Sequence, residues 1–275
     1  MTLAIAHATT AEPIAALLPA RRGQAWKVGP APYGIRANAA MSRITNHGRA
    51  LIVVEQGGIV EIYLDRPDDF PTTPVIAVFA TDPDPVAALA AHILRSVLPG
   101  LDRERADATI HAHGWQQVVV DMAPELNEVA YSLIDHGAHP QVLERADGVA
   151  IRWKADKGAH WTLGVIGASG NLTLSYEGPV GGLYGVLPVL LPSAGGYEPD
   201  DAGSTFTRHL CDRFPQFRPL TGWEVEFGTQ ANPRGLVALP DAGHSPDEMD
   251  DSTPVIAEFG HLGADLLLTA VSHLA

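Results

Sequence analysis

Hydrophobic and polar residues alternate in several short segments, a period of two that is typical of strands with one buried face. Residues 51–54 and 59–64 lie on either side of a glycine-containing turn and predict a hairpin. Residues 149–154, 160–166 and 172–176 predict a meander, in which Leu172, Leu174 and Tyr176 share one face. Further strands are predicted at residues 75–79, 115–121, 184–191, 223–227, 236–239 and 255–259.

Helices are predicted where apolar residues recur with the helical period or where capping residues mark an end. Asp84 followed by Pro85 predicts a helix that begins there and ends before Pro99-Gly100. Residues 102–107 are highly charged and are interpreted as a linker. Other helices are predicted at residues 11–18, 124–134, 205–214 and 262–274.

Two segments of the chain are alike. Residues 73–79 match residues 253–259 at six of seven positions, and in both places strands precede the match and a helix follows it. We therefore expect an α+β protein with mostly antiparallel sheets, built from repeated strand–strand–strand–helix units with two-layer packing. The expected segments are an N-terminal helix and basic arm (1–40), a βββα unit (41–100), a central α+β meander unit (101–215) and a C-terminal βββα unit (216–275), forming one compact body.

Composition indicates a globular protein, because 46% of the 275 residues are hydrophobic and 18% are charged. Cys211 is the one cysteine, which argues against a disulfide-stabilised secreted protein and predicts a soluble, cytoplasmic protein. No uncharged run is long and apolar enough to span a bilayer, so no membrane association is expected. The net charge of −14 makes the protein acidic, and seven acidic residues but no Lys or Arg follow Arg234.

The N-terminal region has the opposite charge. No acidic residue lies between Glu12 and Glu55, although six cationic residues do. Cations can contact phosphates and aromatic rings can stack on bases, so this basic arm predicts a nucleic-acid-binding segment. The alternative is that these cations pair with acidic residues of the same fold. The candidate residues are Arg21, Arg22, Trp26, Lys27, Tyr33, Arg36, Arg43 and Arg49.

A metal site is the next candidate. His111 and His113 would point to the same side of a strand, where both imidazoles could bind one ion. His136 and His139 follow at the end of the next predicted helix, with Asp121 and Asp135 as possible carboxylate ligands. These residue types suit a metal-dependent hydrolase, although their spacing matches no zinc motif.

Other catalytic patterns are missing from the sequence. Ser169 lies in a predicted hairpin turn instead of the strand-to-helix turn that a nucleophile elbow requires. Cys211 lies within a helical pattern and is interpreted as a buried structural residue. No glycine-rich loop fits a phosphate-binding motif, so no cofactor is expected.

Residues 158–197 carry one charged residue, Glu177, and must lie inside the fold or against a partner. Trp161, Tyr176 and Tyr184 in this stretch are candidates for a protein-binding face, with an ordinary sheet core as the alternative. We therefore expect a non-catalytic interaction protein that binds another protein or itself. The alternatives are a nucleic-acid-binding protein and a metal-dependent hydrolase, in that order.

Overall fold

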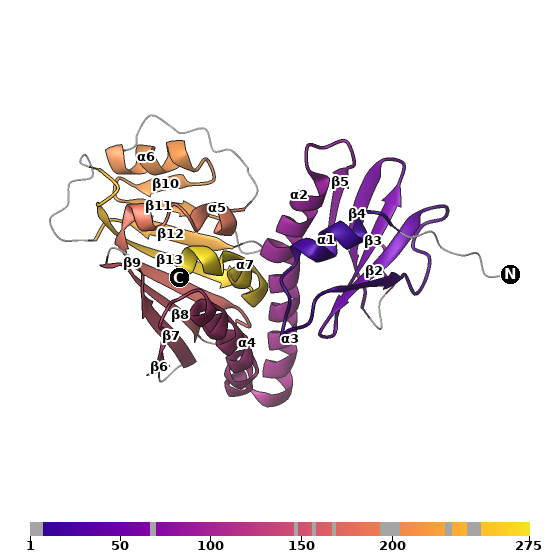
Figure 1. The fold of residues 1–275 in the computed structure, drawn as a ribbon, viewed down its shortest axis with the longest axis horizontal. Coiled ribbons are helices and arrows are strands. Elements are labelled where there is room, and N and C mark those ends of the chain that lie inside the picture. Colours follow the sequence, from indigo (N-terminus) through magenta and orange to yellow (C-terminus); the bar gives the residue numbers. More distant parts are fainter. Residues whose placement is uncertain are drawn as a thin grey trace. The chain divides into compact units, whose positions relative to one another are not determined.

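A computed structural model describes residues 8–66, 70–145, 148–155, 158–166, 169–192, 204–228, 233–240 and 249–275. The chain forms two compact units, Met1–Val97 and Leu98–Ala275 (Figure 1). The four segments expected from the sequence are thus grouped in two units. None of the helices in the described ranges is long and apolar enough to cross a membrane.

The N-terminal unit contains a five-stranded antiparallel sheet with the order β1-β2-β3-β4-β5. Gly57 and Gly58 form the turn between the two strands of the predicted hairpin, both with positive φ, a conformation that glycine adopts without steric cost. Asp84 caps α2, accepting a hydrogen bond from the Ala87 amide at 2.9 Å, as predicted. The elements are α1 (Ala11–Leu17), β1 (Lys27–Pro30), β2 (Ala40–Asn46), β3 (Arg49–Gln56), β4 (Ile59–Leu64), β5 (Ile76–Phe79), α2 (Pro85–His92) and the π-helical turn η1 (Ile93–Val97).

Strand β3 lies at the centre of this sheet, and its apolar side chains are buried on both faces. Helix α1 packs on the sheet at β1 and β2 and also contacts α2. On the face that carries Met41 and Ile52, residues of the segment 31–39 form a second small core with the strands. This segment belongs to the predicted basic arm, so part of the arm lies against the sheet of its own unit.

The C-terminal unit contains an eight-stranded antiparallel sheet with the order β10-β11-β12-β13-β9-β8-β7-β6. Two meanders of four strands, β6–β9 and β10–β13, are joined where β9 pairs with β13. The helices are α3 (Leu98–His113), α4 (Trp115–Asp135), the 3-10 turn η3 (Val180–Gly182), α5 (Leu187–Leu190), α6 (Thr205–Arg213) and α7 (Ala264–Leu274). The strands are β6 (Gln141–Arg145), β7 (Gly148–Lys154), β8 (His160–Ile166), β9 (Leu172–Pro179), β10 (Arg218–Thr221), β11 (Glu224–Phe227), β12 (Arg234–Ala238) and β13 (Pro254–Leu262).

One face of this sheet forms the core of the unit. Leu172, Leu174 and Tyr176 of β9 are buried on it, as their alternation predicted, and α4 packs against β7, β8 and α7. The indole nitrogen of Trp153 on β7 donates a buried hydrogen bond of 2.7 Å to the carbonyl oxygen of Leu274, which fixes α7 to the sheet. The side chains on the opposite face are mainly polar or partly exposed.

The structure confirms a mixed helix and sheet protein with antiparallel sheets, but several local predictions are wrong. The helix that begins after Asp84 was predicted to end before Pro99-Gly100, yet both of these residues lie in the first turn of α3. Residues 115–121, predicted as a strand, form the first part of α4, because Val118 packs inward with the helical period of the residues that follow. The predicted linker 102–107 lies inside α3. The predicted strand 184–191 forms turns and the short helix α5, which begins with Leu187-Pro188; proline suits the first turn of a helix.

The two similar segments have comparable positions in the chain. Segment 73–79 contains β5 and segment 253–259 lies in β13, and each strand is the last of an antiparallel series and precedes a helix. Their environments differ, because β5 is an edge strand whereas β13 lies between β12 and β9.

Candidate functional site

The polar face of the eight-stranded sheet carries a continuous row of side chains. The strand registers align one residue from every strand, so the row crosses the whole sheet. From β6 to β10 these residues are Gln141, Arg152, Thr162, Ser175, Glu258, Leu236, Glu226 and Arg218. Beside it lies a second row that contains His160, Glu177 and Ile256. Because the strands fix both rows, these side chains lie on a rigid support.

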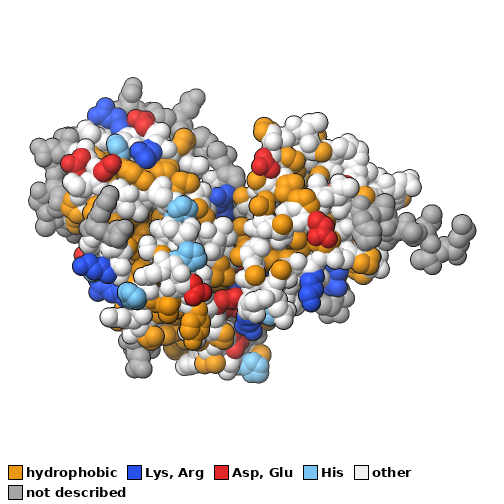
Figure 2. Space-filling view, viewed as in Figure 1, with side chains coloured by type: hydrophobic (Ala, Val, Ile, Leu, Met, Phe, Trp, Pro, Cys, Tyr) orange, Lys and Arg blue, Asp and Glu red, His pale blue; other side chains and the backbone are white. Residues whose placement is uncertain are grey.

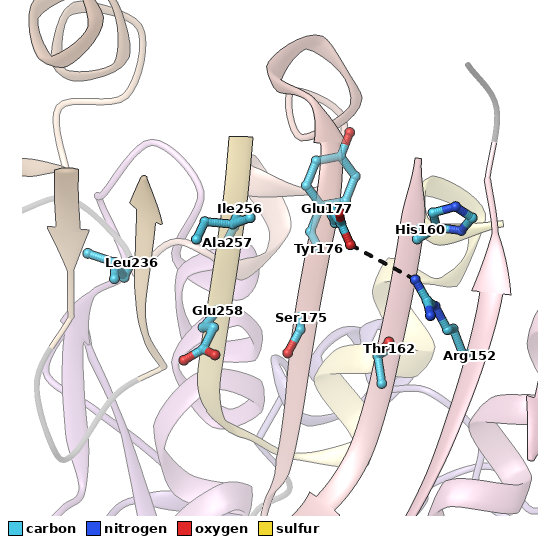
Figure 3. Close-up of a pocket in the computed structure, with 10 residues that line it drawn as sticks. All are labelled: Arg152, His160, Thr162, Ser175, Tyr176, Glu177, Leu236, Ile256, Ala257 and Glu258. Atoms are coloured by element: carbon cyan, nitrogen blue, oxygen red, sulfur yellow. Dashed lines mark ion pairs between the residues drawn. The ribbon is translucent and has the colours of Figure 1, made fainter. Parts of the chain in front are cut away.

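An open hollow of about 420 Å³ lies over the middle strands of this face (Figure 3). Arg152, Ser175 and Glu258 contribute to its lining from three different strands. A second hollow of about 670 Å³ also contains Leu236 and Glu258 and extends to Arg218 and Arg234. The two hollows together cover the outer surface of the sheet from β7 to β10.

Cationic and anionic groups alternate across this surface. Arg152 Nη2 lies 3.9 Å from Glu177 Oε2, and both side chains are largely exposed, so this ion pair contributes little to stability. Arg218 Nε lies 2.9 Å from Glu226 Oε1 near the β10 edge. These pairs neutralise two of the carboxylates of the face.

Glu258 differs from Glu177 and Glu226. Its side chain is exposed, and among the described residues its carboxylate has neither an ion pair nor a hydrogen bond. Two of its neighbours are apolar: Ile256, two positions along β13, is 46% exposed, and Leu236 is its cross-strand neighbour on β12, whereas Ser175 is its neighbour on β9. Within the part of the chain that is described, the centre of the row is therefore an unpaired negative charge beside two aliphatic side chains.

The face has no preformed catalytic arrangement in the part that is described. Ser175 and His160 lie on adjacent strands but are not hydrogen-bonded to each other or to a carboxylate. An activated nucleophile requires a base within hydrogen-bond reach, oriented by a third group.

The predicted basic arm is largely engaged within its own unit. Arg36 Nη2 donates to Glu61 Oε1 at 2.8 Å, and its Nε donates to the Tyr63 hydroxyl at 3.2 Å. The hydrogen bond that Arg36 donates to Tyr63, then the electrostatic interactions with Tyr63 and with Glu61, raise the pKa of Arg36 above its ordinary value. Arg43 Nε lies 2.5 Å from Asp65 Oδ2. Two cations of the arm are thus paired with carboxylates on β4 and just after it, not with the acidic C-terminal residues.

The aromatic residues of the arm are also engaged. Trp26 is buried and donates from Nε1 to the Pro19 carbonyl at 3.1 Å, and the Arg49 guanidinium carbon lies 5.3 Å from its ring centre. The Tyr33 hydroxyl donates to Asp65 Oδ1 at 2.7 Å. Arg21 is buried, whereas Arg22 and Lys27 are exposed. The structure does not bring these rings and cations together as an open stacking surface.

The strand predicted for His111 and His113 is wrong, because both residues lie in the last turn of α3. On a helix, residues two apart point in directions that differ by about 200°, so the two imidazoles do not share a face. His136 Nδ1 lies 2.8 Å from the Ser132 carbonyl oxygen, and His139 is exposed beyond α4. Within the ranges that the structure describes, no three His, Cys, Asp or Glu side chains come together to hold a metal ion.

Trp161 and Tyr176 do not form a partner-facing surface. Both are buried on the helix-covered face, with ring centres 4.5 Å apart, because they occupy inward positions of β8 and β9. Tyr184 is half-buried after η3, where its hydroxyl lies 2.8 Å from His209 Nε2. The sheet-core interpretation of this stretch is correct for Trp161 and Tyr176.

Glu258 was not among the residues selected from the sequence, although one signal marks it. It is the single position at which residues 253–259 depart from residues 73–79, where Val78 stands instead. A charge in an apolar strand pattern is an outward-facing position that packing does not require. The strand order that brings Glu258 beside Ser175 could not be read from the pattern.

Comparisons of the chain with family models, with curated proteins and with solved structures gave no match.

Proposed function

We propose that this protein is a non-catalytic binding protein whose partner is another protein, held on the polar face of the eight-stranded sheet. One observation carries the proposal: the carboxylate of Glu258, unpaired among the described residues, lies in an open hollow beside exposed Ile256 and half-buried Leu236. A carboxylate beside aliphatic groups matches a Lys or Arg side chain, whose methylene groups pack on apolar surface while its charged end meets the acid.

The energetics of this contact suit an anchor residue. A fully exposed ion pair contributes about 0.2–1 kcal/mol. A hydrogen bond to a charged group contributes about 1.5–3 kcal/mol when a partner covers it and excludes water. A partner that covers Ile256 and Leu236 would remove water from Glu258, so the free-energy contribution of the anchor contact would lie closer to the larger of these two values.

The charge of the face favours a protein partner over a nucleic acid. Glu177, Glu226 and Glu258 line its two hollows together with Arg152, Arg218 and Arg234, so the face lacks the excess of cations that binding to phosphate groups requires. The rows of side chains across antiparallel strands instead suit an extended or looped polypeptide that presents a cation to the middle of the sheet.

The proposal includes two features of the predicted fold, the two-layer packing and the repeated unit. We infer two-layer packing, in which α4 and α7 cover one face of the eight-stranded sheet and leave the other for the partner. We also infer that the segments containing β5 and β13 descend from a duplicated unit, supported by their sequence match and by the helix after each. The substitution at Glu258 would then have created the anchor in one copy.

Selection of displayed peptides tests the proposal. Random peptides of about a dozen residues are selected on the immobilised full chain, and the enriched ones are synthesised and titrated by fluorescence anisotropy. We expect enrichment of Lys or Arg beside apolar residues. Glu258→Gln, which removes the charge and keeps the shape, should raise Kd by about 5- to 30-fold, corresponding to a loss of about 1–2 kcal/mol.

Two further variants test whether the peptides bind at this part of the sheet. Ile256→Asp should also weaken binding, because it places a second polar group where the aliphatic stem packs. Asp107→Asn on α3 removes the same charge from an exposed position outside this face and should leave Kd unchanged. Selected peptides that bind wild type, Glu258→Gln and Ile256→Asp equally well would refute the proposal.

A further inference from the structure

Helix α4 has two apolar faces, although a helix on the surface of a globular protein usually has one. The first face, formed by Val118, Leu126, Val129 and Leu133, is buried. It accounts for the packing of α4 on the sheet and on α3 and α7. The second face lies about 160–200° around the helix and is exposed.

The exposed face is a stripe with heptad spacing. Val120, Tyr131 and Ile134 are 62%, 69% and 49% exposed, and Pro124 and Asn127 between them are also exposed. The intervals between the five residues are four, three, four and three, which is the spacing of the contact positions of a coiled coil. Figure 2 shows hydrophobic side chains exposed over the region of α4. We call these five residues the α4 stripe.

An acidic row borders the α4 stripe on one side. Asp121 and Asp135 are exposed and are separated by two heptads, and Glu128 occupies the same heptad position between them. Asp121 accepts a hydrogen bond of 2.8 Å from Gln117 Nε2, which leaves its charge in place. The equivalent positions on the other side of the stripe are Ala123 and Ala130.

We propose that the α4 stripe is a second binding surface, which takes an amphipathic helix of another protein with basic residues beside its apolar seam. In a coiled-coil contact the residues next to the seam select the partner by charge. An antiparallel second copy of this chain would bring the acidic row against itself, which is repulsive. A basic helix would instead pair with Asp121 and Asp135, and this charge match selects the partner.

The dimensions of the stripe define the partner further. From Val120 to Ile134 the helix advances about 21 Å, at about 1.5 Å per residue. A single partner helix of about 15 residues covers that length. Asn127 in the middle is a polar contact position, a feature that fixes the register of paired helices at a cost in affinity. The contact therefore belongs to the small, transient class of interfaces, below about 1,200 Å².

Labelled synthetic helices test this second surface on the full chain. The probe is a fluorescein-labelled peptide of about three heptads with Leu at the contact positions and Lys beside them, and the matched peptide carries Glu instead of Lys. Fluorescence anisotropy should show that the Lys peptide binds at least about tenfold more tightly than the Glu peptide. The difference should decrease as salt is raised, because the charges are exposed.

Variants place the binding on the stripe. Tyr131→Glu should raise Kd of the Lys peptide at least about tenfold, since it puts a charge in the centre of an apolar contact. Asp121→Lys combined with Asp135→Lys should reverse the preference toward the Glu peptide. Ile256→Asp, on the sheet, should leave the peptide affinity unchanged, so failure of this surface is distinguishable from failure of the sheet surface. Circular dichroism of each variant confirms that it is folded.

Three results would each overturn the inference: equal affinity for the two peptides, absence of binding, or unchanged affinity in Tyr131→Glu. Sedimentation velocity of the chain alone provides a fourth. A wild-type dimer that dissociates in Tyr131→Glu would show that a second copy, not a basic helix, covers the stripe.

Discussion

Replacement of Trp161 by alanine distinguishes a core position from a partner-facing one. Trp161 is 1% exposed; it stacks on Trp153, with ring centres 6.4 Å apart, and its other neighbour is the tilted ring of Tyr176. Alanine would bury about 150 Å² less apolar surface than tryptophan. At about 25 cal/mol per Å² this is a loss of about 4 kcal/mol, within the range of about 3–5 kcal/mol measured for buried Trp or Phe replaced by Ala.

Hydrogen exchange with mass spectrometry measures this loss in each unit separately, which a single unfolding curve of a two-unit chain does not. Amides of β8 and β9 in Trp161→Ala should lose about 3–5 kcal/mol of protection. Amides of β2 and β3 in the N-terminal unit serve as the internal control and should be unchanged. Trp161→Phe, which keeps an aromatic ring, should lose less. A change below about 1 kcal/mol in β8 would refute the assignment of Trp161 to the core, because exposed substitutions typically lie within about 0.5 kcal/mol.

Three further outcomes are expected. Gly170→Ala should destabilise the C-terminal unit in the same exchange experiment, because φ is +67° there and an added Cβ would lie 2.6 Å from a carbonyl oxygen of α3; unchanged protection would contradict the packing. Burial and then the charge of Asp212 raise the pKa of Cys211 to about 11, so its thiol should react slowly with Ellman's reagent at pH 8 and faster as the pH approaches 11, and a reaction as fast as that of free cysteine at pH 8 would disagree. Burial and then the charge of Asp251 raise the pKa of Tyr184 to about 12. Asp251→Asn should therefore lower the pKa of Tyr184 in an ultraviolet titration. An unchanged titration would show that Asp251 does not act on Tyr184.

Local patterns were sufficient for most strands. The hairpin around Gly57-Gly58 and the meander up to Tyr176 were predicted because alternation and turn residues are local signals. The helix cap at Asp84 followed from two adjacent residues. Such features depend on neighbours in the sequence, so they can be predicted without knowledge of the tertiary fold.

Helix α4 shows why other predictions failed. Val118, Val119 and Val120 resemble a strand, and Pro124 resembles the first residue of a new helix. The helix nevertheless runs through Pro124, which is exposed. A proline leaves the carbonyl four residues earlier without its helical partner, and on an exposed face water can satisfy that carbonyl. Tertiary packing of Val118 and Leu126 decided the conformation, and the pattern around Pro124 gave no sign of it.

The candidate site was the least predictable part. Trp161, Tyr176 and the histidines were selected by residue type, yet their positions depend on which sheet face the helices cover and on the helical conformation of residues 98–113. Glu258 depends on the pairing of β13 with β9, two strands about 80 residues apart in the sequence. Contacts of that range are not encoded in local periodicity.

The pairing of β13 with β9 also determines when this sheet can form. During synthesis β13 is the last strand of the sheet to emerge from the ribosome, yet it occupies an interior position between β12 and β9. Until then β9 and β12 each have an unpaired edge, and such edges promote aggregation of nascent chains. The surface that carries Glu258 is therefore assembled in the last step, so chains that stop before β13 should require chaperones to remain in solution.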